Sequence, residues 1–188
     1  MARLSYDAMR NLILDNIDSL PNSTIFTPEL LTAIFWEETG FQNIAQFVGG
    51  PAVGFGQVER ATIKAVNQFF KTNFTPELIL ADNNASVRIT SLTLAQLLVG
   101  IGSKTGALRG YAGVFSNPAN APIPGRWLEC ERRLMVAHAA DRVPGSAAIV
   151  ERLTYATDAG PIKEALRAAK PNSDPDLAFP ITDGAVPA

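Results

Sequence analysis

Apolar side chains recur at three- and four-residue spacing along most of the chain, which is the pattern of amphipathic helices. The pattern predicts helices over about residues 5–19, 28–39, 59–70, from 75, 85–100, 127–141, 147–156 and 161–169. Strand-like alternation is short and scattered. We therefore expect a mostly α fold with a small irregular or β element near residues 41–58.

Helix boundaries are marked by local chemistry. Two of the helices begin with the same five letters, FTPEL, at residues 26–30 and 74–78. In each, threonine is placed as the N-cap, proline at the first helical position and glutamate near the positive end of the helix dipole. Gly40 is placed to stop the helix that begins at Pro28.

Two stretches have no helical period. Residues 116–126 are rich in proline, asparagine and glycine, which predicts an extended surface loop. Residues 170–188 contain four prolines, and we expect them to form a C-terminal tail or arm. The rest, residues 1–169, is predicted to be a single helical domain.

Composition narrows the class of protein. With 188 residues, 47% apolar and 18% charged, the chain is long enough and apolar enough for a globular domain. A net charge of −2 without a basic cluster argues against nucleic acid as a partner. The most apolar stretch, residues 89–101, is interrupted by polar residues and too short for a bilayer, so no membrane span is expected. The first residues, MARLSYDAMRNLILDN, lack the apolar segment and cleavage site of a secretory signal, which predicts synthesis and initial retention in a cytoplasm.

Metal and nucleophile chemistry have little support in the sequence. Cys130 is the single cysteine and His138 the single histidine, so neither an internal disulfide nor a metal cluster is expected, and no cofactor is implied. His138 lies in a helical pattern, where a lone histidine is more often packed or solvated than catalytic. No Gly-x-Ser-x-Gly turn supports a serine nucleophile.

Two adjacent carboxylates end the apolar helix 28–39. On a helical wheel Glu38 falls close to the direction of the apolar face, while Glu37 lies about a quarter turn away, so Glu38 is the better candidate for burial. Burial and the negative end of the helix dipole would both raise its pKa and keep it protonated, as a general acid requires. The simpler alternative is a glutamate that solvates the helix end or pairs with a basic residue.

A glycine-rich segment, GGPAVGFGQ, follows at residues 49–57. Its glycines allow sharp turns and close approach of the backbone to a ligand, and Gln57 can hold a polar substrate through its amide. The segment lacks the lysine and the preceding strand of a phosphate-binding loop, so a nucleotide is not expected.

Together these motifs resemble those of the lytic transglycosylase and goose-type lysozyme superfamily. The chain reads LLTAIFWEETGF at residues 30–41, then GFGQ at 54–57 and Ala-Thr at 61–62. The family has an apolar helix ending in Glu-Ser-x-Phe, then Gly-Leu-Met-Gln, then a helix containing Ala-Thr. The segment GGPAVGFGQVE is also similar to small lysozyme-like proteins carried in tailed-phage particles. The resemblance covers roughly residues 28–70, and it implies a lysozyme-like domain with a catalytic-type core at about residues 27–115.

The resemblance implies roles for individual residues. Glu38 would be the catalytic acid, because it is the glutamate followed by Thr-Gly-Phe. Thr39 stands where the family has serine, and Glu59 could position a water, as an acidic residue does in goose-type lysozymes. A Tyr-Ala-Gly triplet at residues 111–113 is similar to the end of the family's Tyr-Asn-Ala-Gly signature. The residues implied to bind substrate are Thr39, Gly54, Gln57, Glu59 and Tyr111.

The implied activity is cleavage of the bond between N-acetylmuramic acid and N-acetylglucosamine in peptidoglycan, by transglycosylation or by hydrolysis. A phage protein could be built into particles in the host cytoplasm without a secretion signal and act on the bacterial cell wall from outside. Its partners would be the glycan strand and other virion proteins. Two alternatives remain open: a structural virion protein of the tail or particle interior that keeps the lysozyme-like shape without turnover, and a cytosolic helical adaptor with a fortuitous motif.

Overall fold

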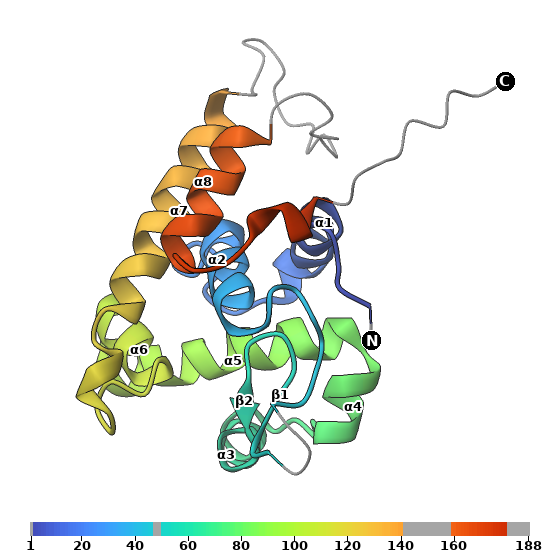
Figure 1. Ribbon diagram of the computed structural model, residues 1–188. Helices are drawn as coiled ribbons and strands as arrows, with labels where there is room; N and C mark the ends of the chain where they lie inside the picture. Colours follow the sequence, from blue (N-terminus) through green and yellow to red (C-terminus); the bar gives the residue numbers. More distant parts are fainter. Residues whose placement is uncertain (1, 47–49, 141–158, 180–188) are drawn as a thin grey trace, which may run out of the picture.

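The computed structural model describes residues 2–46, 50–140 and 159–179. This part of the chain forms eight α-helices and a two-stranded hairpin, which lies beside α3, α4 and α5 (Figure 1), and this confirms the prediction of a mostly α fold with a small β element. The elements are α1 (Tyr6–Asn16), α2 (Pro28–Thr39), β1 (Ala52–Val53), β2 (Val58–Glu59), α3 (Arg60–Phe70), α4 (Pro76–Ala81), α5 (Asn83–Ile101), α6 (Lys104–Tyr111), α7 (Ile123–Ala140) and α8 (Gly160–Ala169). Three short 3₁₀ helices lie at Ile17–Ser19, Pro118–Asn120 and Pro175–Ala178.

Helix α2 forms the centre of the larger hydrophobic core. It packs against α1, α7 and α8, and every residue from Leu30 to Trp36 is buried. In Figure 1, α7 and α8 lie side by side along one flank, and α5 runs past α2 toward α6. A second, smaller core joins the hairpin to α3, α4 and α5. The hairpin is antiparallel, with Ala52 opposite Glu59 and Val53 opposite Val58.

The ends of α2 match the sequence prediction because its caps are local. The Thr27 hydroxyl accepts a hydrogen bond from the Leu30 N–H at 3.2 Å, and Pro28 occupies the first turn, where no N–H is needed. Gly40 ends the helix in the left-handed conformation, with a φ of 60°.

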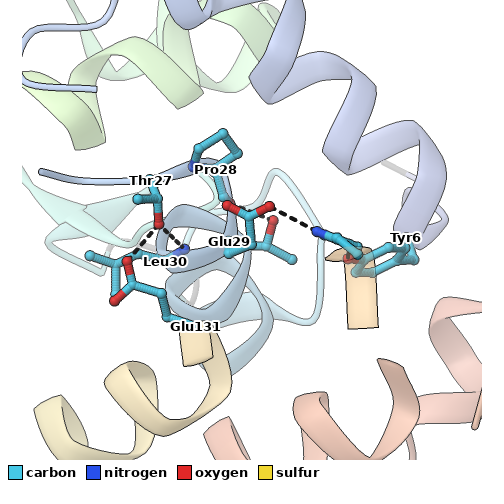
Figure 2. Close-up of polar contacts among 8 residues, drawn as sticks. Tyr6, Thr27, Pro28, Glu29, Leu30 and Glu131 are labelled. Atoms are coloured by element: carbon cyan, nitrogen blue, oxygen red, sulfur yellow. Dashed lines mark hydrogen bonds and ion pairs between the residues drawn. The ribbon is translucent and has the colours of Figure 1, made fainter. Parts of the chain in front are cut away.

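Polar contacts with distant elements also fix the N-terminal end of α2 (Figure 2). The Thr27 hydroxyl donates to Glu131 of α7 at 2.6 Å. Two turns further along α7, His138 lies 2.8 Å from Glu29 through Nδ1 and 2.7 Å from the Tyr6 hydroxyl through Nε2. These contacts join α1, α2 and α7, so His138 has a packed, structural position, as expected for a lone histidine in a helix.

The segment after α8 lies against the domain. The Trp36 indole N–H donates to Ser173 at 3.2 Å, and the ring of Phe179 stacks on Tyr6 with centroids 5.7 Å apart. Pro175 and Ala178 are buried. The first part of the predicted tail, residues 170–179, is therefore packed, while residues 180–188 and the predicted helix 147–156 lie outside the described residues.

Two predictions for the region after α5 need correction. The stretch 116–126 is not wholly an extended loop, because it contains a 3₁₀ helix at Pro118–Asn120 and the start of α7 at Ile123. Pro124 is compatible with that start, since the first turn of a helix has no use for its missing N–H. Helix α6 was not predicted; Ser103 caps it by accepting from the Gly106 N–H at 3.2 Å.

No helix in the described part of the chain is long and apolar enough to cross a bilayer.

Candidate active site

The candidate site begins where α2 ends. Gly40 and Phe41 are both left-handed, with φ of 60° and 65°. This conformation is unfavourable for a bulky residue such as Phe41, and it is held because the ring is fully buried against Trp36, with centroids 5.1 Å apart. The sharp reversal directs the chain from the two glutamates toward the hairpin (Figure 1).

Thr39 connects the end of α2 to the hairpin loop. Its hydroxyl lies 3.2 Å from the Phe35 carbonyl oxygen in its own helix and 3.1 Å from that of Phe55 in the loop. The Phe55 N–H in turn donates to the buried Ser86 hydroxyl of α5 at 2.8 Å. The predicted glycan-binding threonine is thus buried and occupied by backbone contacts, and it fixes the loop relative to Glu38.

The glycines of the loop are required by close packing inside the protein. Gly54 has a φ of 86°, and a Cβ there would lie 2.7 Å from the Ser86 hydroxyl. A Cβ on Gly56 would lie 2.4 Å from the hydroxyls of both Thr90 and Tyr111. The sequence predicted close approach of this backbone to a ligand; the structure places α5 and α6 side chains directly against it.

Tyr111 brings the start of the C-terminal half of the chain to this loop. Its hydroxyl donates to the Gly56 carbonyl oxygen at 2.6 Å, and its ring meets Trp127 edge to face with centroids 6.0 Å apart. Burial raises the pKa of the phenol, and the negative charge of Glu38 raises it further. Tyr111 is therefore protonated throughout the ordinary pH range and lies within electrostatic reach of Glu38.

Glu38 has the protonation behaviour of a general acid. Its side chain is partly buried, and desolvation raises its pKa from 4.5 to about 7. The neighbouring charge of Glu37 adds to this rise, whereas Lys170, just after α8, opposes it. Near neutral pH the carboxyl is therefore present in both its protonated and its ionised form.

Glu37 has a different environment from that of Glu38. Its carboxylate forms an ion pair with Arg126 of α7, and its side chain is 13% exposed. Burial raises its pKa, and the hydrogen bond and charge of Arg126 act against this rise. The Trp127 indole also favours the ionised form, although no hydrogen bond joins the two: Glu37 Oε2 and Trp127 Nε1 are both buried without a partner among the described residues.

A groove of about 540 Å³ runs between α3, α5 and the segment from Tyr111 to Ser116. Of the predicted substrate-binding residues, Gln57, Glu59 and Tyr111 line it, whereas Thr39 and Gly54 do not. The predicted catalytic residue Glu38 does not line it either. Tyr111 is the link, because it lines the groove and also interacts with Glu38.

The polar side chains of the groove differ in availability. The amide nitrogen of Gln57 donates to the carbonyl oxygens of Ile44 and Gly54 at 3.0 and 2.8 Å, so its hydrogens are used to hold the loop. Glu59 is exposed at the start of α3. Further polar groups, which sequence reasoning missed, come from α3 and α5: Thr62, Thr93 and Gln96.

Arg126 and Lys170 are charged neighbours of the two glutamates that could not be selected from the sequence. Arg126 lies in α7 and Lys170 just after α8, and no local motif connects either residue with the end of α2. Within the residues that the structure describes, no group of three or more His, Cys, Asp or Glu side chains could hold a metal ion.

Comparisons of the chain with protein-family models, with curated proteins and with solved structures give no match.

Proposed function

We propose that this protein is a lysozyme-like, peptidoglycan-cleaving protein carried in a phage particle. Its substrate is the glycan strand, and the bond cleaved is that between N-acetylmuramic acid and N-acetylglucosamine. Glu38 serves as general acid and then as general base. The observation that carries the proposal is the burial of Glu38 at the junction of α2, the hairpin loop and Tyr111, which raises its pKa to about 7.

The arrangement of the elements supports the same class. A lysozyme-like site needs a buried helix that ends in the catalytic glutamate, followed by a turn that carries the next motif. Here the Thr39 hydroxyl donates to the Phe55 carbonyl oxygen and so joins the glutamate-bearing end of α2 to the GFGQ loop. Tyr111, the first residue of the Tyr-Ala-Gly triplet, donates to the same loop. Three segments that resemble the family in sequence are thus joined by hydrogen bonds in space.

The reaction follows from the proton on Glu38. The protonated carboxyl donates to the bridging glycosidic oxygen as the bond to C1 of the muramic acid breaks. The resulting carboxylate accepts a proton from the muramic O6 hydroxyl as O6 attacks C1, which gives a 1,6-anhydro product, or from a water that attacks C1, which gives hydrolysis. The first course needs one carboxyl group, and the second is helped by another carboxylate such as Glu59.

A non-catalytic virion protein with the same fold is the second candidate. The specific observation in its favour is that several motif residues are used internally: the Gln57 amide hydrogens are bonded to backbone, and Gly54 packs against Ser86. A chain that has kept the motif only to fold would show these same contacts. The two candidates differ in turnover, which can be measured directly.

The test is release of soluble fragments from purified peptidoglycan sacculi by the full-length protein and by Glu38→Gln. Glu129→Gln is the matched control, because Glu129 is exposed on α7 and paired with Arg132 and Arg133. We expect release by the wild type and by the control, and at least a hundredfold less by Glu38→Gln, in line with the contribution of a general acid of about 10² to 10⁴. Mass spectrometry separates anhydro from hydrolysed ends.

The outcomes separate the candidates. Release by neither the wild type nor Glu38→Gln, with all proteins folded, would favour the structural role. Equal release by both would move the acid to another residue, with Glu37→Gln as the next variant.

A further inference from the structure

Two carboxyl groups stand next to each other at the end of α2, and both lose solvation on folding. Glu37 pairs with Arg126 and also feels the positive charge of Lys170, whereas Glu38 interacts electrostatically with Lys170 and Tyr111. The thiol of Cys130 on α7 also lies within electrostatic reach of Glu37, and burial raises its pKa to about 12, so it carries no charge at neutral pH. The guanidinium group of Arg126 forms its ion pair with Glu37 and not with Glu38.

Arg126 is held in place by a second contact. Its Nη2 pairs with Glu37 Oε1, and its Nε donates to the Ala169 carbonyl oxygen at the end of α8, at 3.1 Å. The side chain thus bridges the start of α7, the end of α8 and the end of α2. Because the guanidinium group is held by two contacts, its positive charge stays at one place beside Glu37, which would not be true of a mobile surface cation.

We propose that Arg126 and Glu37 form a positioning pair for Glu38: the guanidinium group keeps the negative charge of the two adjacent carboxyls on Glu37, and so the proton stays on Glu38. The inference rests on the proposed function of Glu38 as the acid, and it explains how two neighbouring carboxyls take different roles. Arg126 and Glu37 do not touch the reacting atoms and act through Glu38.

The size of the effect follows from Coulomb's law. If the two carboxylates of adjacent helix residues are taken as about 8 Å apart, an effective dielectric constant between about 20 and 80 gives an interaction of roughly 0.4 to 1.5 pKa units. Replacing Glu37 by the isosteric glutamine removes this repulsion, so the titration midpoint of Glu38 should fall by that amount. The neutral amide can still accept from Arg126, which keeps the bridge between the helices.

The measurement is a carboxyl ¹³C NMR titration of the full-length protein labelled at glutamate. The Glu38 signal is assigned by its absence in Glu38→Gln. We compare wild type, Glu37→Gln, Arg126→Gln and the charge-conserving Arg126→Lys, with Glu129→Gln as the remote control, and thermal unfolding checks that each variant is folded.

The expected results have different directions. In the wild type Glu37 loses its proton at lower pH than Glu38. In Glu37→Gln the Glu38 midpoint falls by roughly 0.4 to 1.5 pH units. In Arg126→Gln the midpoint of Glu37 rises and both carboxyls titrate in two shared steps, as coupled sites do. Arg126→Lys keeps the positive charge but cannot make both contacts, so the gap between the Glu37 and Glu38 midpoints should narrow without reversing. The control keeps the wild-type midpoints.

An unchanged or raised Glu38 midpoint in Glu37→Gln overturns the proposal, as does a wild type in which Glu37 holds its proton to higher pH than Glu38. The titration requires no turnover, so its result stands apart from that of the sacculus assay. If glycan is cleaved, the alkaline limb of the pH profile should move down in Glu37→Gln by the same shift as the NMR midpoint. Cleavage by Glu37→Gln with an unmoved alkaline limb would reject the positioning pair, and the assignment of the acid would then rest on the Glu38→Gln sacculus assay alone.

Discussion

Glu38 makes the stability of the protein depend on pH in a way that can be measured without a substrate. The perturbation is Glu38→Gln, which replaces the titrating carboxyl by a neutral group of the same shape. The pKa of Glu38 is about 7 in the folded protein against an ordinary value of 4.5. The folded state therefore binds this proton more tightly than the unfolded chain does.

The sign and size follow from proton linkage. Below about pH 4.5 the carboxyl is protonated in both states, and Glu38 has no pH-dependent effect on stability. Between about pH 4.5 and 7 the unfolded chain loses this proton while the folded state keeps it, so the free energy of unfolding decreases; the decrease levels off once the folded state is also ionised. The pKa difference corresponds to about 3 kcal/mol, fully developed above about pH 8. Because glutamine does not titrate, Glu38→Gln should gain this amount relative to wild type between pH 4 and pH 8.

Urea unfolding followed by tryptophan fluorescence is the assay, since Trp36 and Trp127 are both buried and report the main core. Glu129→Gln is the control: its ion pairs lower the pKa of Glu129 to about 2, so this carboxyl is ionised in both states from pH 6 to 8 and the difference from wild type should stay constant there. A constant difference for Glu38→Gln across pH 4 to 8 would refute the reasoning. Other titrating groups are common to both proteins and cancel, apart from the coupling to Glu37.

Three further predictions test the packing around the site and the core. Gly56→Ala should destabilise the protein by about 1 to 3 kcal/mol in urea unfolding, because the new Cβ would meet two hydroxyls at 2.4 Å. Gly100→Ala, which has open space around it, should instead stabilise α5 by about 0.5 to 1 kcal/mol. Equal stabilities of the two variants would contradict the packing described for Gly56. Tyr6→Phe should lower the free energy of unfolding by about 1 to 3 kcal/mol, because the hydrogen bond to His138 is lost. Thermal unfolding measures the change, and an unchanged midpoint would mean that this hydrogen bond does not stabilise the protein. Cys130 should react with iodoacetamide only after unfolding in urea, because the thiol is buried and its pKa is raised to about 12; rapid labelling of the native protein would contradict its burial.

The parts of the fold that the sequence predicted are those determined by local chemistry. Helix α2 could be placed from Thr27 to Gly40 because its caps depend only on neighbouring residues. Helix α6 could not, since Gly106 and Gly110 are poor helix formers in an eight-residue segment. Their lack of side chains allows α6 to lie close to Ile101, so tertiary packing compensates for the weak propensity.

The same division applies to the site. A helix that ends in two glutamates before a glycine-rich segment was enough to select Glu38 and the segment around Gln57 as candidates. The pairing of Glu37 with Arg126 had no sequence signal, because a contact between residues 89 positions apart is decided by how α7 packs on α2. The hydrogen bonds from the Gln57 amide to the backbone were equally unpredictable, since the side chain of a glutamine in a loop can bind either the backbone or a ligand.

The contacts that surround α2 have a consequence for synthesis on the ribosome. Three contacts around α2 join residues that are far apart in the sequence. They are Glu37–Arg126, 89 residues apart, Tyr6–His138, 132 apart, and Trp36–Ser173, 137 apart. A nascent chain that has emerged only as far as the hairpin carries both glutamates but none of these later partners. Such long-range pairs form late and slow folding, so the surroundings of the two glutamates are complete only when α7, α8 and Ser173 have left the exit tunnel.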